Sequence, residues 1–149
     1  MSVFVDTNVL LRSVQPSDPS HDLAVRATAW LIESGETLII TPQVGAEFWN
    51  ALTRPRVNNG LGFSPGQAHR ELAQLEGFFT VVSESPEVYR EWVNLVTRYS
   101  VRGVQAHDAR LVAAMKVYTI RRLLTFDTED FSRYQDIEVI HPQSLGRQP

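Results

Sequence analysis

Two aspartates follow short apolar runs of the kind that form buried β-strands. Asp6 comes directly after the run 2–5, and Asp127 comes directly after the run 123–126. In a parallel sheet the carboxyl ends of the strands meet at one edge, where such folds place their functional groups. Two interpretations are open for each residue: Asp often caps the turn that follows it, and a carboxylate at this edge can also belong to an active site.

Two further acids lie on helical segments beside apolar residues. Asp108 shares one helix face with the apolar residues three, four and seven positions later, and Glu47 flanks the apolar face of its own segment. A carboxylate on a buried face is costly unless it is paired, hydrogen-bonded or bound to a metal. Asp108 could instead be stabilised by the helix dipole, and Glu47 could reach solvent or pair with an arginine such as Arg54.

Four carboxylates at one edge of a sheet would repel one another without a cation between them. Oxygen ligands and the absence of cysteine favour Mg²⁺ or Mn²⁺. Such a site suits hydrolysis of phosphodiester bonds, because bound metal ions activate water and neutralise the phosphate. The residues predicted to form this catalytic metal site are Asp6, Glu47, Asp108 and Asp127.

The elements that must position these acids alternate between short apolar runs and helical patterns. This alternation is typical of an α/β domain with a mostly parallel, covered sheet, and no linker or repeat divides the single domain expected over residues 1–149. Strands are expected at 2–5, 37–40, 78–82, 121–125 and 137–140. Helices are expected at 8–14, 23–32, 41–54, 64–75, 85–99 and 107–117, with a loop at 57–66.

Four segments carry a family resemblance. VFVDTNVLL (3–11), AEFWNAL (46–52), HDARLVAAM (107–115) and LLTFDTEDF (123–131) resemble the four motifs of the PIN-domain ribonucleases, in the same order and spacing, and are most similar to those of VapC-type toxins of toxin–antitoxin systems. The ending IEVIHP (137–142) resembles the last strand of the family. The resemblance implies a three-layer α/β/α domain with a central, mostly parallel sheet of four or five strands, and an Mg²⁺- or Mn²⁺-dependent endoribonuclease.

The same resemblance implies a role for each acid. Asp6 would be the central metal ligand, and Glu47 and Asp108 would complete the acidic pocket around the ion. Asp127 would be the fourth acid, acting through water or on a second ion, at a position where many members have Asn. The turn 116–120 lacks the glycine that many members carry, which affects its local geometry rather than the chemistry.

Other implied features concern the surroundings of the pocket and its partners. Thr7 and Asn8 would shape the pocket by hydrogen bonding and contact the substrate, and Asp130 would hold the turn before Phe131. The implied partners are an RNA substrate, a cognate antitoxin protein and a second copy of the chain. Which RNA is cleaved does not follow from these residues, because RNA specificity lies in loop shape and RNA fold.

Composition restricts the classes of function. The net charge of −3 excludes a strongly basic DNA-coating protein. The absence of cysteine removes disulfides and thiolate metal sites and fits a reducing compartment, so a cytoplasmic protein is expected. The longest unbroken hydrophobic run, 111–115, is far shorter than a membrane span, so no membrane segment is expected.

Two arginines and one histidine have less specific positions. Arg54 and Arg56, before the Asn-Gly loop, are predicted to contact RNA phosphates, although a plain solvated loop is an equal alternative. His107 precedes Asp108, and a capping or loop role is favoured over that of a catalytic base.

Competing functions are weaker. A receiver domain needs a phosphoacceptor Asp after a central strand and a lysine after a late strand, but 78–83 ends without Asp and the only lysine, Lys116, lies in a predicted helix. A phosphatase of the haloacid-dehalogenase type needs Asp-x-Asp after its first strand, and Asn8 replaces the second Asp. The remaining alternative is a non-catalytic PIN-like module that binds RNA or protein.

Overall fold

Within the described residues, 1–145, the computed structural model contains one sheet of five parallel strands in the order β3-β2-β1-β4-β5. The last four residues of the predicted domain, 146–149, lie outside this description. The strands are β1 (Ser2–Val5), β2 (Thr37–Ile40), β3 (Thr80–Val81), β4 (Arg122–Leu124) and β5 (Glu138–Ile140). The prediction of a mostly parallel sheet of four or five strands is confirmed.

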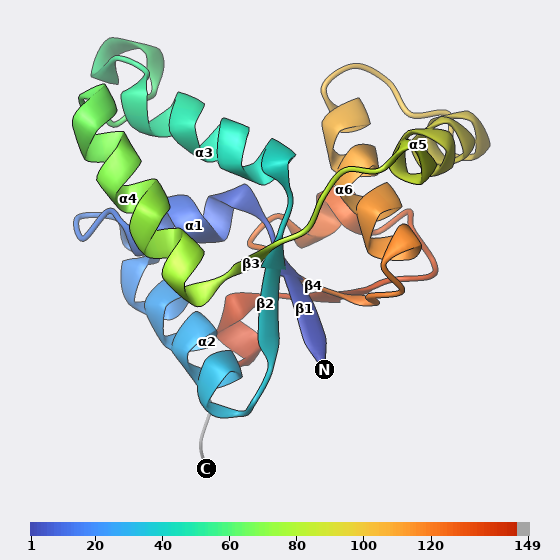
Figure 1. Cartoon of the computed structure of the whole chain (residues 1–149), viewed down its shortest axis with the longest axis horizontal. Coiled ribbons are helices and arrows are strands. Elements are labelled where there is room, and N and C mark those ends of the chain that lie inside the picture. The colour runs from blue at the N-terminus through green and yellow to red at the C-terminus, as the bar shows by residue number, and fades with distance from the viewer. Residues whose placement is uncertain (146–149) are drawn as a thin grey trace.

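Helices cover both faces of the sheet and complete three layers (Figure 1). Right-handed crossovers place α1 to α4 on one face, and α5 and α6 on the other. The α-helices of residues 1–145 are α1 (Thr7–Ser13), α2 (His21–Glu33), α3 (Pro42–Thr53), α4 (Pro65–Phe78), α5 (Pro86–Arg98) and α6 (Gln105–Val117). Short 3₁₀ helices are η1 (Arg56–Asn58), η2 (Thr128–Phe131) and η3 (Pro142–Ser144). None of these helices is long and apolar enough to cross a membrane.

The central strands β1, β2 and β4 are apolar after their first residues, because both of their faces are covered. Val3, Phe4 and Val5 of β1 are completely buried, as are Leu123 and Leu124 of β4. Truncating a buried Phe such as Phe4 to Ala would cost about 3–5 kcal/mol. This tightly packed pair of strands fixes the residues that follow their carboxyl ends.

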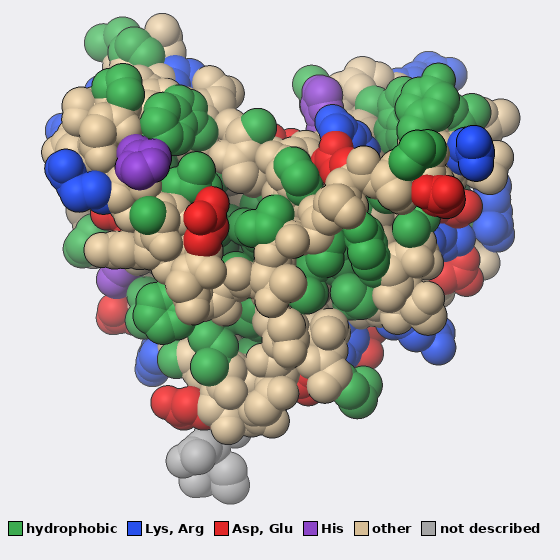
Figure 2. Space-filling view, in the orientation of Figure 1, with side chains coloured by type: hydrophobic (Ala, Val, Ile, Leu, Met, Phe, Trp, Pro, Cys, Tyr) green, Lys and Arg blue, Asp and Glu red, His purple; other side chains and the backbone are tan. Residues whose placement is uncertain are grey.

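A crevice lies beyond β1 and β4, where the strand order reverses. The chain proceeds from β1 to β2 and β3 on one side and then returns to β4 on the other side of β1. The connections therefore leave β1 and β4 toward opposite faces, which opens a crevice outside their carboxyl ends. Figure 2 shows the surface hollowed between the lobe of α3 and α4 and the lobe of α5 and α6.

The third strand differs most from its prediction over 78–82. Helix α4 continues through Gly77 to Phe78, which leaves only Thr80–Val81 to pair with β2 at the edge of the sheet. Both of these strand residues are exposed. Residues 56–58 form η1, although the predicted loop 57–66 included the last two of them. In the turn before β4, Thr119 lies in the left-handed region at φ 57°.

Candidate active site

Asp6 ends β1 and begins α1. Its Oδ1 accepts a hydrogen bond from the backbone N–H of Thr7 at 2.8 Å. Its Oδ2 accepts one from the hydroxyl of Thr125 at 2.8 Å and one from the side-chain amide of Asn8 at 3.2 Å. The capping interpretation of Asp6 is confirmed, and the same carboxylate also lies buried in the crevice, with 9% of its surface exposed.

Glu47 reaches the crevice from α3, whose amino end is capped by the Thr41 side chain. Its Oε2 accepts a hydrogen bond from the hydroxyl of Thr7 at 2.7 Å, and its Oε1 accepts one from the side-chain amide of Gln43 at 2.8 Å. The alternative in which Glu47 pairs with Arg54 is wrong, because the Arg54 guanidinium donates to a loop carbonyl instead. Glu47 is thus held by two neutral donors rather than by a basic side chain.

The Asn8 side chain donates hydrogen bonds to both Asp6 and Asp127. Its side-chain amide donates to Asp127 Oδ2 at 3.1 Å and to Thr125 Oγ1 at 3.0 Å, and its Oδ1 accepts the backbone N–H of Phe126 at 3.1 Å. The Thr125 hydroxyl also accepts the backbone N–H of Asp127 at 3.1 Å. Hydrogen bonds therefore connect the segments after β1 and β4, while contact of Thr7 and Asn8 with substrate stays a prediction.

Asp108 enters from the first turn of α6. Burial, followed by repulsion from the charge of Asp6 and from Asp130, raises its pKa to about 7. A helix amino end normally favours a charged carboxylate, so the loss of solvation and the neighbouring acids outweigh the dipole here. Burial is also the main reason that the pKa of Asp6 is raised to about 6, although its hydrogen bonds from Thr125 and Thr7 oppose the rise.

The charges of the four predicted acids act on one another, as the causes of the two raised pKa values indicate. Glu47 and Asp127 add to the raised pKa of Asp6, and both also act on Asp108. Asp130 is exposed in η2, and its side chain makes none of the hydrogen bonds found within residues 1–145. Its predicted role in holding the turn is therefore not seen, and its charge instead acts on Asp108.

The two predicted RNA-binding arginines lie at the other end of α3. Arg54 follows the last residue of the helix, seven residues after Glu47, a rise of about 10 Å along the axis. Its guanidinium donates to the backbone oxygen of Asn59 at 3.1 Å and so holds the loop that follows. Arg56 is exposed in η1. The structure does not bring either arginine together with the acids.

The donor set of the crevice fits a hard cation held partly through water. Within the described residues, no group of three Asp, Glu or His side chains is arranged to hold one ion directly. Mg²⁺ commonly keeps several waters and uses one or two carboxylates. The buried carboxylate of Asp6, with Asp108 near it in the same field, matches that requirement, whereas direct ligation by all four acids stays a prediction.

The order of strands, the crevice and its acids agree with the match to a protein family. The model of the PIN domain matches residues 3–137. The chain belongs to the PIN-domain family. No curated protein gives a significant match to the sequence.

Solved structures share the PIN fold at low sequence identity. VapBC2 from Rickettsia felis, bound to a DNA fragment from its promoter, has a TM-score of 0.74 and 14% identity, covering 95% of this chain and 98% of that one. Mycobacterium tuberculosis VapC20, a toxin that cleaves the sarcin–ricin loop, has a TM-score of 0.66 and 20% identity, covering 89% and 95%. A toxin–antitoxin complex from Klebsiella pneumoniae has a TM-score of 0.59 and 18% identity, covering 94% and 97%. At these identities the likeness establishes the PIN fold alone.

Two residues that hold the PIN-domain acids were missed by sequence reasoning. Gln43 donates to Glu47 and, at 2.9 Å, to the backbone oxygen of His107, which links α3 to α6. Thr125 is completely buried, and its hydroxyl donates to Asp6 and accepts the backbone N–H of Asp127. A threonine at the end of the apolar run 123–126 was the available signal for the second residue, whereas nothing in the sequence near Gln43 indicates its partners.

Proposed function

We propose that this PIN-domain protein is an endoribonuclease that hydrolyses RNA phosphodiester bonds with the help of Mg²⁺ or Mn²⁺. The observation that carries the proposal is the pair of aspartates in the crevice: hydrogen bonds fix Asp6, and burial together with the charge of Asp6 raises the pKa of Asp108. Perturbed carboxylates in a crevice are typical of functional sites. A divalent cation would relieve the repulsion between them.

In this proposal the acids bind the metal ion and a neighbouring threonine positions two of them. Asp6, Glu47 and Asp108 would hold the ion, directly or through water, and Asp127 would bind it through water or take a second ion. The bound ion supplies activation of water and stabilisation of charge on the phosphate. Thr7 donates its hydroxyl to Glu47 and its backbone N–H to Asp6, so it keeps both carboxylates in place before any substrate binds.

Partners are proposed from the solved PIN structures. VapBC2 and the Klebsiella pneumoniae protein are toxin–antitoxin assemblies, and we propose that this chain is likewise the toxin of a pair, blocked by an antitoxin, and that it forms a homodimer. Large apolar side chains of α2, namely Val25, Trp30 and Ile32, are about 40% exposed and offer surface for protein contacts. Size-exclusion chromatography with light scattering tests the dimer.

Cleavage of total cellular RNA by the purified protein tests the nuclease directly. Cleavage at discrete sites is expected with Mg²⁺ or Mn²⁺ and not with EDTA. Asp6→Asn should reduce the rate by more than about 100-fold, because metal-based charge stabilisation contributes several kcal/mol. Asp22→Asn, which changes an exposed acid of α2, is the matched control and should cleave normally. Folded protein that cleaves nothing would instead support the non-catalytic module.

A further inference from the structure

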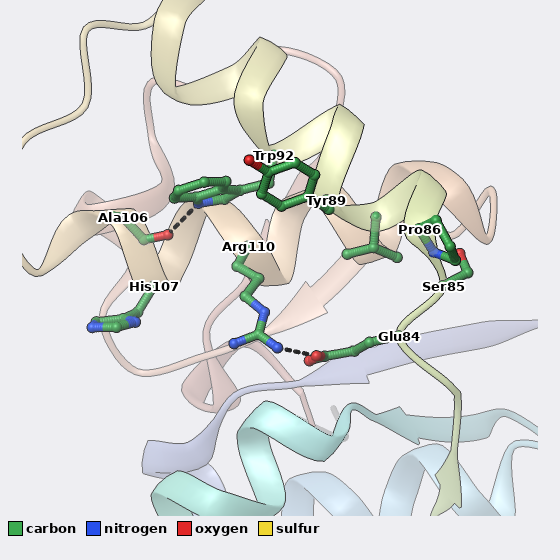
Figure 3. A pocket seen from close by; sticks show the side chains of 9 residues that line it. Glu84, Ser85, Pro86, Tyr89, Trp92, Ala106, His107 and Arg110 are labelled. Carbon is green, nitrogen blue, oxygen red and sulfur yellow. Dashed lines mark hydrogen bonds and ion pairs between the residues drawn. The ribbon is translucent and has the colours of Figure 1, made fainter.

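A second cavity lies beside the acidic crevice, between the amino-terminal halves of α5 and α6 (Figure 3). Its volume is about 570 Å³, within the range of about 300–1,000 Å³ that is typical of small-molecule sites. Aromatic, imidazole and guanidinium groups line it, from Tyr89, Trp92, His107 and Arg110. None of these side chains belongs to the set of acids described above.

One wall of the cavity is a fixed aromatic platform. The Trp92 indole N–H donates to the backbone oxygen of Ala106 at 2.8 Å, which ties the ring to α6. Tyr89 lies against it with ring centroids 6.0 Å apart and an interplanar angle of 35°. Tyr89 remains 65% exposed, so the face of an incoming ring can stack on it.

The opposite side of the cavity carries the ion pair of Arg110 and Glu84, both of which line it. The Arg110 side chain is 44% exposed and pairs with the carboxylate of Glu84. Glu84 also accepts the backbone N–H of Gln43 at 3.3 Å, and the Gln43 side chain donates to Glu47. A continuous series of polar contacts thus connects Arg110 to the acidic crevice.

We propose that this cavity binds one nucleotide of a single-stranded RNA segment adjacent to the cleaved bond. The base stacks on Tyr89, and Arg110 leaves Glu84 to bind the neighbouring phosphate. Unstacked RNA bases are recognised by aromatic rings and arginine planes, and phosphates by arginine. The inference rests on the proposed ribonuclease function. It adds a binding position that selects single-stranded RNA and contacts the base adjacent to the cleaved bond.

Binding of a fluorescein-labelled, mixed-sequence single-stranded RNA 8-mer tests the subsite. Anisotropy is measured with Ca²⁺ in place of Mg²⁺ and again in EDTA, and gel electrophoresis confirms that the RNA stays intact. Tyr89→Leu and Arg110→Gln should each weaken the Kd about tenfold or more, because stacking on one aromatic side chain alone has about this effect. Tyr89→Phe should bind like wild type, since it keeps the ring.

The matched control is Arg26→Gln, which changes an exposed arginine of α2 away from the cavity. It should leave the Kd unchanged. Equal binding by wild type, Tyr89→Leu and Arg110→Gln would overturn the subsite, as would a wild type that binds an acidic peptide of equal charge but no RNA. Cleavage of total RNA that depends on Asp6 would then still support the nuclease, so the two proposals fail separately.

Discussion

Replacing Asp6 by Asn should change how the stability of the metal-free protein depends on pH. Burial raises the pKa of Asp6 from 3.8 to about 6 in the folded state. Between these values the folded protein retains a proton that the unfolded chain has released, so the free energy of unfolding falls as pH rises. The whole shift corresponds to about 3 kcal/mol, of which about 2 kcal/mol is lost between pH 4 and pH 7.

Other acids either reinforce this trend or act at lower pH. The pKa of Asp108, raised to about 7 by burial and then by the charge of Asp6, extends the fall in stability in the same direction. Its partial exposure weakens the effect through solvent screening. Glu36 and Asp136 have lowered pKa values because of their partners Arg122 and Lys116, so the stability that they contribute is lost only as pH falls through their acidic titration range. The decline from about pH 5 to pH 7 therefore belongs to the crevice.

Urea unfolding in EDTA, followed by tryptophan fluorescence from pH 4 to pH 7, measures the effect. Asp6→Asn carries a constant cost, since its amide would face the donors of Thr125 and Asn8. The informative quantity is therefore the difference in the free energy of unfolding between variant and wild type, followed as a function of pH. From pH 4 to pH 7 this difference should change by about 2 kcal/mol in favour of the variant. Asp22→Asn should run parallel to wild type. Parallel curves for Asp6→Asn as well would refute the raised pKa of Asp6.

Three other substitutions test single features of the structure. Thr125→Val should lower the free energy of unfolding by about 1–3 kcal/mol in urea, because buried donors of the crevice lose their acceptor. Thr119→Gly should raise the free energy by about 0.5–1 kcal/mol in thermal unfolding, since φ is 57° there, and Thr119→Ala should give no such gain. Gly60→Ala should cost about 1–3 kcal/mol in the same measurement, because a Cβ would lie 1.8 Å from the backbone oxygen of Arg54. Gly45→Ala, with open space around it, is its control and should not destabilise.

The elements were predictable wherever a local signal marked their ends. Pro42, Pro65 and Pro86 each begin a helix after a Thr or Ser, and the structure starts α3, α4 and α5 at these residues. The third strand was not predictable to the same degree, because Phe78 and Phe79 fit an apolar strand as well as the end of a helix. Its two exposed edge residues provide no burial pattern that would have set its limits.

The acids of the site were predictable because each breaks a local pattern, and the family resemblance implied the hydrogen bonds of Thr7 and Asn8, but the contacts of Gln43 were not predictable. Asp6 and Asp108 stand next to apolar residues, and that conflict is visible in the sequence. Gln43, by contrast, is a polar residue in a first helical turn, where polar residues are common. Its bonds to Glu47 and to the backbone of His107 depend on how α3 and α6 meet across the crevice. Such tertiary contacts leave no local pattern in the sequence.

The raised pKa values give stability and cation binding opposite dependences on pH. Above about pH 7 both Asp6 and Asp108 are charged, so the metal-free fold carries its greatest repulsion. A cation must displace any protons that these carboxylates hold, so its affinity increases over the same range in which the metal-free fold weakens. The hydrogen bonds from Thr125 and Thr7 keep Asp6 in position while no cation balances its charge. The fold thus maintains a strained pair of acids whose repulsion a divalent ion would relieve.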